Sequence, residues 1–342
     1  MWDRFLRACR REPVDRTPVW FMRQAGRYMQ EYRDIRKDHT LLDICKNAEL
    51  CTEVTLQPIV AHKVDAAILF ADILLPLEPM GAPFEFAKGE GPIVHHPIRT
   101  VADVERLRVI EAADGLEYVL NAIRMIRREL DGKTPLIGFA GAPFTLASYL
   151  IEGGKSSQYI RTKQFMFSEP KAWDELMGKL AEVVRRYLRA QIEAGAQAVQ
   201  LFDSWVGSLS PQDYEQRILP HVAHILQDIE KTGVPVIHFG TGTTSLLELQ
   251  KRAGGTVMGI DYRSTLTDAH RRLGNDVAYQ GNLEPMLLLA PWDVLAPRAT
   301  QVIEEGKLLP GHIFNLGHGI VPEVDPNTVT RLVEFIHETS VR

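Results

Sequence analysis

The feature that most constrains the fold of this chain is a regular recurrence of short apolar segments. Eight of them, rich in β-branched and aromatic residues, lie at 17–22, 65–70, 134–140, 196–203, 234–240, 256–261, 277–282 and 312–317. Most lack strict alternation of apolar and polar residues. That pattern is typical of strands whose two faces are both buried, as in a parallel sheet.

Helical patterns fill the intervals between these segments. In 116–130 and 172–192, apolar residues recur at spacings of three and four, which predicts one apolar stripe on an otherwise charged helix. After the sixth and seventh segments, 264–274 and 291–306 each leave room for another helix. Eight strands that alternate with helices predict an α/β fold, the (β/α)8 TIM barrel.

An open, doubly wound sheet is the alternative fold. It would need a glycine-rich fingerprint directly after the first strand, where the phosphates of a dinucleotide bind. The segment at that place, "MRQAGRY" (22–28), is not such a fingerprint.

Two segments account for the length of the chain beyond a minimal barrel. The chain has 342 residues, whereas a typical barrel needs about 250. Residues 3–11 predict an additional N-terminal helix, and "PFEFAKGEGPIV" (83–94) predicts a β-hairpin with a Lys-Gly-Glu-Gly turn after the second strand. Since no linker or low-complexity tract interrupts the pattern, we expect one domain over 1–342.

Charge and composition limit the classes of partner. The net charge of −5 argues against nucleic acid as a ligand, although residues 1–37 hold ten Lys and Arg against five acids. The most apolar stretch, 66–81, contains Asp72 and two prolines and is too short to span a membrane. Three cysteines without a CxxC pattern indicate a reduced, cytoplasmic protein.

The barrel prediction selects candidate site residues without reference to any motif, because active sites of this fold lie at the carboxyl ends of the strands. The main candidates are Arg23, Arg27, Asp72, Tyr149, Ser204 and His318. Further strand-end residues are Asp203, His238, Asp261, Gln280 and Asn282.

Arg23 and Arg27 lie four residues apart. If the segment after the first strand is helical, both guanidinium groups lie on one face and repel each other unless an anion lies between them. Their planar forks suit carboxylate or phosphate groups. The alternative is a structural network with acids such as Glu31 and Asp34.

Asp72 is the only charge in "AILFADILLP" (67–76). A lone carboxylate in apolar surroundings is costly unless it is paired or hydrogen-bonded. It either pairs with an arginine for structural reasons or accepts N–H groups from a ligand and stabilises a cation.

The other candidates also allow structural roles. Tyr149 could simply pack in the core, and Ser204 could cap a helix. His318 lies between two glycines at a strand end, and backbone freedom on both sides favours contact with a ligand.

The sequence offers few groups for a metal or an organic cofactor. It contains neither HExxH nor His-x-Cys, and its cysteines all precede residue 52. No strand-end lysine is present for pyridoxal phosphate. We therefore expect no metal and no cofactor, and an acidic organic molecule as the ligand.

Two long motifs carry a family resemblance. "PVWFMRQAGRYMQEY" (18–32) and "GFAGAPFTLASYLIEGG" (138–154) resemble the signatures of the uroporphyrinogen decarboxylase family. "FADIL" (70–74), "LFDSWVG" (201–207) and "NLGHGI" (315–320) resemble three further segments of that family. Asp203 departs from the many members that have Glu there.

The resemblance implies a fold and an activity. Members are (β/α)8 barrels, typically homodimers, in haem and other tetrapyrrole biosynthesis. They remove the four acetate carboxyls of uroporphyrinogen III as CO2 and give coproporphyrinogen III, without a cofactor.

The resemblance also implies roles for individual residues. Asp72 and Arg23 correspond to catalytic positions. Substrate contacts fall on Arg23, Gln24, Ala25, Gly26, Arg27, Arg36, Asp72, Tyr149, Ser204 and His318.

Two other functions remain open at this point. A zinc- and corrinoid-dependent methyltransferase of the same superfamily would need His-x-Cys, but "IHFGTG" (237–242) lacks the thiol. A non-catalytic tetrapyrrole-binding protein would use the same arginines.

Overall fold

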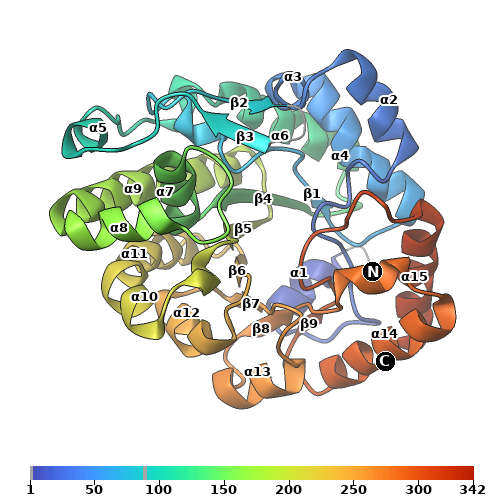
Figure 1. Cartoon of the computed structure of the whole chain (residues 1–342). Helices are drawn as coiled ribbons and strands as arrows, with labels where there is room; N and C mark the ends of the chain where they lie inside the picture. Colours follow the sequence, from blue (N-terminus) through green and yellow to red (C-terminus); the bar gives the residue numbers. More distant parts are fainter. Residues whose placement is uncertain (1–2, 88–90) are drawn as a thin grey trace.

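The computed structural model describes residues 3–87 and 91–342, and a parallel sheet forms its centre. Figure 1 shows the strands in the middle and the helices around them. The strands pair in the order β1, β4, β5, β6, β7, β8, β9. Their bounds are β1 Ala67–Ile68, β4 Leu136–Gly141, β5 Ala198–Asp203, β6 Val236–Gly240, β7 Val257–Gly259, β8 Ala278–Gln280 and β9 His312–Ile313.

The first predicted strand, 17–22, closes the ring as an isolated bridge. Val19 pairs in parallel with Phe314, just beyond β9. On its other side, the Val19 carbonyl accepts a hydrogen bond from the backbone N–H of Asp65 at 2.8 Å. Seven of the eight predicted strands are therefore present in the sheet, the first is reduced to a single bridge, and the fold is of the predicted barrel type.

Helices follow the strands in the predicted alternation. Those before and beside the hairpin are α1 Arg4–Cys9, α2 Gln30–Asp38, α3 Leu41–Lys46, α4 Ala48–His62 and α5 Val101–Glu105. The next are α6 Glu117–Leu130, α7 Pro143–Glu152, α8 Ile160–Ser168, α9 Pro170–Ala194, α10 Pro211–Arg217 and α11 Leu219–Glu230. The last are α12 Leu247–Ala253, α13 Leu266–Leu273, α14 Trp292–Lys307 and α15 Pro326–Thr339. Short 3-10 turns lie at Leu75–Leu77, Ala112–Asp114, Val206–Ser208, Thr244–Leu246 and Pro285–Leu289.

Both predicted additions to the barrel are present. Helix α1 packs against β8 and β9. The hairpin pairs β2 Phe84–Ala87 with β3 Gly91–Val94 in antiparallel register. Residues 88–90 of its predicted turn lie outside the described residues.

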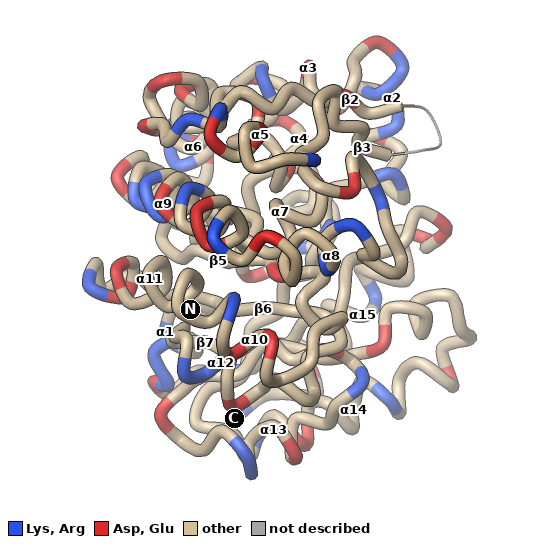
Figure 2. Tube along the Cα trace, turned by 60° about the vertical axis from the view of Figure 1, so that its left-hand side comes forward, with Lys and Arg blue, Asp and Glu red and all other residues tan. Residues whose placement is uncertain are grey.

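Helix α9 shows how the apolar stripe directs packing. Trp173, Leu176, Leu180 and Val184 are buried, while charges of both signs follow the exposed side of the helix (Figure 2). This helix packs against α11, α7, α6 and β4. Burial of one stripe therefore fixes the helix on the outside of the barrel.

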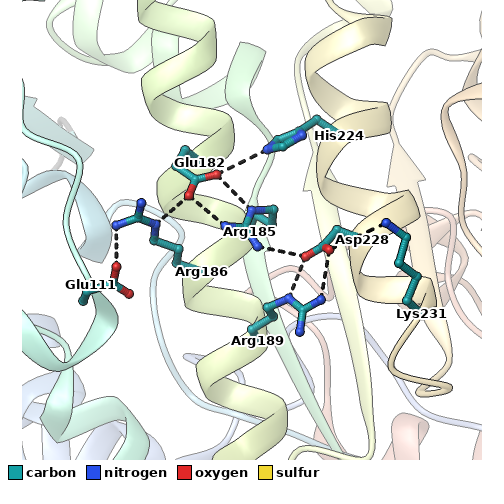
Figure 3. Close-up of polar contacts among 8 residues, drawn as sticks. All are labelled: Glu111, Glu182, Arg185, Arg186, Arg189, His224, Asp228 and Lys231. Carbon is teal, nitrogen blue, oxygen red and sulfur yellow. Dashed lines mark hydrogen bonds and ion pairs between the residues drawn. The ribbon is translucent and has the colours of Figure 1, made fainter.

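Ion pairs join the outer sides of α9 and α11 (Figure 3). Arg185 and Arg189 of α9 both bind Asp228 of α11, at 3.0 and 2.6 Å. Glu182 accepts from Arg185 and Arg186 at 2.7 and 2.6 Å. The network cross-links two helices that also share an apolar interface.

Within the described parts of the chain, none of the helices combines the length and the apolar composition that crossing a bilayer requires.

Candidate active site

Four of the predicted side chains come together at the carboxyl end of the barrel. Arg23 follows the ring-closing segment, Asp72 follows β1, Tyr149 lies on α7, and His318 follows β9. The positive charge of Arg23 influences the pKa of each of the other three. Segments almost 300 residues apart in the sequence therefore share one electrostatic environment.

The loop that carries Arg23 and Arg27 is not helical. Residues 21–29 form turns, and α2 begins only at Gln30. The condition under which the two arginines would share one face of a helix is therefore not met. Arg23 adopts a left-handed backbone with φ of 62°, so that the loop turns sharply at this residue.

Gly319 makes room for the Arg23 side chain. A Cβ at this glycine would lie 2.5 Å from Cδ of Arg23 and 2.8 Å from Cγ. Neither Gly317 nor Gly319 has a positive φ. The glycines around His318 therefore serve close approach rather than the backbone freedom inferred from the sequence.

Arg23 and Arg27 have no acidic partner within 4.0 Å among residues 3–87 and 91–342. Asp34, a proposed partner, pairs instead with Lys37 at 2.6 Å. Both arginines are exposed. Among the described residues, Arg23 and Arg27 therefore do not belong to a structural network of ion pairs.

Gln24 points into the protein and holds the loop. It is 1% exposed. Its Oε1 accepts from the N–H of Phe21 at 3.1 Å, and its Nε2 donates to the carbonyl of Ala66 at 3.0 Å. The side chain of Gln24 is thus engaged by backbone on both sides. Ala25 and Gly26 follow it, half-buried, in the same turn.

Arg27 and Arg36 lie near the ring of Tyr32. The charges of both arginines act on the Tyr32 hydroxyl, whose pKa is raised chiefly by burial. Arg36 lies on α2 and donates to the carbonyl of His39 at 2.8 Å. Tyr32 in turn packs against Phe70, with ring centroids 5.3 Å apart.

Asp72 is half-buried and has no cation within 4.0 Å in the described chain. Its Oδ1 accepts from the N–H of Leu74 at 2.8 Å. Burial raises the pKa of this carboxyl to about 6, although the Leu74 N–H and the Arg23 charge both lower it. The carboxylate is therefore available to a ligand and easily protonated.

Tyr149 is half-buried and packs on Trp205, with ring centroids 4.0 Å apart and the ring planes tilted by 34°. Burial, assisted by the Asp72 charge, raises the pKa of the Tyr149 hydroxyl, so that it stays protonated and can donate. Ser204 precedes Trp205 and does not cap a helix, because the following 3-10 turn begins at Val206 and Trp205 is its N-cap residue. The Ser204 carbonyl accepts from the Thr241 hydroxyl. Trp205 is a wall of the site that the sequence did not single out.

His318 is half-buried, and its Nδ1 accepts from the N–H of Gly319 at 2.7 Å. The proton of the neutral ring therefore lies on Nε2. Burial, followed by the charge of Arg23, lowers the pKa of His318. At neutral pH the residue is an uncharged donor.

The remaining strand-end residues bind neighbouring groups of the barrel, and the charge of Asp261 also acts on the pKa of His318. His238 is fully buried and faces α12, where its Nδ1 lies 3.2 Å from the carbonyl of Gln250. Gln280 accepts from Trp20 Nε1 at 3.0 Å and donates to Gln200 at 3.0 Å, a polar layer inside the barrel. Asp261 binds Arg263, and Asn282 donates to the Asp261 carbonyl.

Asp203 is buried under the β5 end of the site. Its Oδ1 accepts from the Thr145 hydroxyl at 2.9 Å. Burial raises the pKa of this carboxyl to about 7.

The described residues contain no group of three or more His, Cys, Asp or Glu side chains arranged to hold a metal ion.

Comparison with known proteins identifies the family. The family profile described as "Uroporphyrinogen decarboxylase (URO-D)" matches residues 2–339. The chain belongs to this family. A protein named uroporphyrinogen decarboxylase from Sorangium cellulosum is 67% identical over 337 residues, which cover 98% of this chain and 96% of the relative. One from Carboxydothermus hydrogenoformans is 55% identical over 340 residues, 99% of this chain and 97% of the relative.

A solved structure shares the fold at lower identity. A methyltransferase from Methanosarcina mazei superposes with a TM-score of 0.82 at 22% identity, covering 98% of this chain and 97% of that one. A B12-independent methionine synthase from Shewanella has a TM-score of 0.55 at 8% identity, with coverages of 88% and 91%. The uroporphyrinogen decarboxylase family therefore uses a barrel that methyltransferases also use.

Proposed function

We propose that this chain decarboxylates uroporphyrinogen III. Four acetate carboxyls leave as CO2, and coproporphyrinogen III is the product. The near full-length family match supports the reaction. The observation that carries the proposal is Asp72, a carboxylate without a cationic partner in the described chain, which lies in an apolar setting within the field of an unpaired Arg23.

The difficulty of the reaction explains what the protein must supply. Loss of CO2 from an acetate arm leaves an electron pair on carbon, and decarboxylases usually provide a cofactor as the electron sink. Here the pyrrole ring of the substrate serves instead. A proton added to a ring carbon makes an iminium-like cation. The electrons of the breaking C–C bond flow into that cation as CO2 leaves. A second proton converts the exocyclic methylene into a methyl group, and loss of the first proton from the ring carbon restores the pyrrole, so that one proton is taken up for each CO2 released.

We assign to Asp72 the stabilisation of this cation. Its ionised carboxylate accepts the pyrrole N–H groups, and its charge opposes the positive charge that develops on the ring. A fixed charge in a poorly solvated site stabilises a transition state much more strongly than it would in water.

We assign proton delivery to Arg23, which lies near both Asp72 and His318. Because a guanidinium group scarcely deprotonates, Arg23 would act as a relay, replacing its proton from solvent as it gives one up.

Arg27 and Arg36 would bind the peripheral carboxylates, with Nε2–H of His318 and the hydroxyls of Tyr149 and Ser204 as further donors. The substrate carries eight carboxylates, so an excess of guanidinium groups around one apolar mouth suits it. Gln24, Ala25 and Gly26 would contact the substrate through the backbone of their turn, since the Gln24 amide is already paired.

Anaerobic incubation with uroporphyrinogen III tests the proposal. After oxidation to porphyrins, chromatography separates products by the number of carboxyls, and we expect four per molecule. Asp72→Asn keeps the shape and removes the charge, and its turnover should fall about 100- to 1,000-fold. Tight binding with all eight carboxyls retained would instead indicate a tetrapyrrole-binding protein.

We further propose that the protein is a homodimer of single-domain subunits and works in the cytoplasm. Family resemblance supports these assignments. Light scattering on the purified protein would test the dimer, for which the mass should be about twice 38.6 kDa.

A further inference from the structure

The segment that presents Asp72 has little support from the barrel sheet. Strand β1 comprises only Ala67–Ile68. The last backbone hydrogen bond from this segment to β4 runs from the N–H of Leu69 to the carbonyl of Ile137, at 3.0 Å. Phe70, two residues before Asp72, therefore needs other partners for its backbone.

Helix α4 supplies those partners. The N–H of Phe70 donates to Oγ1 of Thr55 at 2.9 Å, and the carbonyl of Phe70 accepts from Sγ of Cys51 at 3.1 Å. Both side chains are 1% exposed. They lie four residues apart, on one face of the helix.

The Thr55 side chain also acts on the Cys51 thiol, whose pKa it lowers. Burial raises the pKa of the Cys51 thiol to about 12, so that the thiol keeps its proton and can donate to Phe70. Both backbone groups of one residue are thus held by a helix in place of a neighbouring strand.

The side chain of Phe70 also contacts helix α2. Its ring packs on Tyr32 of α2, beside Arg27 and Arg36. Asp72 follows Phe70 by two residues, a separation of about 7 Å at most. A shift of Phe70 would therefore move the carboxylate relative to Arg23.

We propose that Cys51 and Thr55 are positioning residues, which fix the Asp72 carboxylate in the mouth through the backbone of Phe70. The inference rests on the proposed function, in which Asp72 is catalytic. Neither side chain needs to touch the substrate.

Thr55→Val tests the idea because it keeps the shape and removes the hydroxyl. We expect kcat to fall about tenfold with KM changed less than twofold, since small misplacements of a catalytic group cost about 10- to 100-fold. Thr55→Ser should restore most of kcat. Cys51→Ala should resemble Thr55→Val.

Thr52→Val is the matched control on the same helix. Thr52 donates to the carbonyl of Ala48 at 2.7 Å, a bond within α4 that does not involve Phe70. We expect wild-type kcat from this variant. Equal losses in Thr52→Val and Thr55→Val, or a loss that matches the unfolded fraction in a thermal melt, would overturn the positioning role.

A second readout does not depend on turnover. Titration of the Asp72 carboxyl carbon by NMR, assigned with Asp72→Asn, should give an altered pKa in Thr55→Val and the wild-type value in Thr52→Val. An unchanged Asp72 titration in Thr55→Val overturns the inference even if kcat of that variant falls. Absence of decarboxylation by the wild-type protein would overturn the proposed function alone.

Discussion

Asp72 shows how its surroundings set the chemistry of a single carboxyl group. The sequence identified it as the lone charge of an apolar segment, and the structure leaves it without an ion-pair partner in the described chain. Burial raises its pKa, whereas Arg23 and the Leu74 N–H oppose that rise. The sequence could indicate the residue, but only the fold brings Arg23 and Tyr149 to it.

A pH profile should reveal the ionisation of Asp72. Its pKa is raised to about 6, so that the ionised form predominates only above that pH. If this form is required, kcat/KM should rise about tenfold per unit below pH 6 and level off above it. The measurement is kcat/KM between pH 5 and 8 under anaerobic conditions.

Two variants separate Asp72 from its neighbours in that profile. The charge of Arg23 lowers the pKa of Asp72, so residual activity of Arg23→Gln should show the rise at higher pH. His318→Asn should keep the wild-type profile, because the pKa of His318 is already lowered and the ring is neutral. If the rise of kcat/KM below pH 6 disappeared in His318→Asn, that rise would belong to the ionisation of the histidine and not to Asp72.

Gly319 tests whether the place of Arg23 matters. A Cβ at residue 319 would lie 2.5 Å from Cδ of Arg23, a flexible side chain that can move away at small cost in stability. Gly319→Ala should therefore lower kcat/KM about 10- to 100-fold and leave the melting temperature nearly unchanged.

The matched control is Gly178→Ala in the interior of α9. A Cβ there meets nothing within 4 Å. Because alanine is the better helix former, the variant should be more stable by about 0.5–1 kcal/mol, with wild-type kcat/KM. Full activity in Gly319→Ala would contradict the proposed role of Arg23 in proton delivery.

At the scale of elements, the periodicity of apolar residues predicted the helices, whereas the spacing of charged residues did not predict the structure of the loop that carries them. The patterns at 116–130 and 172–192 became α6 and α9, because each stripe is buried against the barrel. The four-residue spacing of Arg23 and Arg27 did not make a helix. A left-handed turn at Arg23, held by Gln24 and Gly319, determines that loop instead. These contacts come from distant segments, so local sequence could not show them.

The ion pairs between α9 and α11 should make stability depend on pH. Arg185 and Arg186 lower the pKa of Glu182 to about 2. A carboxyl whose pKa is lower in the folded state stabilises the protein above its unfolded pKa of about 4.5, and this contribution is lost as pH falls toward 2. Glu182→Gln should therefore reduce the free energy of unfolding by about 1 kcal/mol at pH 7, with a difference roughly half as large at pH 3.

Urea denaturation at both pH values measures this effect. Glu304→Gln is the control, because Glu304 forms a single pair with Lys307 and its side chain is 58% exposed. We expect no measurable change from it. A difference for Glu182→Gln that is as large at pH 3 as at pH 7 would show that packing, not charge, is lost.

At the scale of the whole molecule, the strand count predicted the barrel, but not how the ring closes. The first predicted strand, 17–22, lies at the predicted position, but it pairs through a single bridge with Phe314, just beyond β9. On the side of this segment that faces β1, the Asp65 carboxylate replaces a missing ladder hydrogen bond, since its Oδ2 accepts from the N–H of Val19 at 2.8 Å. A side chain that replaces a ladder hydrogen bond leaves no periodic signal in the sequence.

Asp65 also joins the two ends of the chain, and this predicts a large effect on stability. Its Oδ1 lies 2.6 Å from Nη1 of Arg4 on α1, and its Oδ2 lies 2.7 Å from Nε2 of His337 on α15. The Asp65 and Arg4 side chains are only 6% and 14% exposed. Asp65→Asn removes one of two carboxylates that bind Arg4, since Nη2 of Arg4 also lies 2.8 Å from Oδ2 of Asp15. The loss of this charged hydrogen bond and of the one to His337 should cost about 2 kcal/mol of unfolding free energy.

Denaturation and activity together test this role. Glu12→Gln is the control, because Glu12 pairs with Arg7 at 3.6 Å on the surface, and its removal should change little. Folded Asp65→Asn should keep wild-type kcat, since Asp65 lies before β1, whereas Asp72 and the other groups of the mouth follow the strands. A stability near wild type would mean that the single bridge and the apolar core close the ring without the carboxylate.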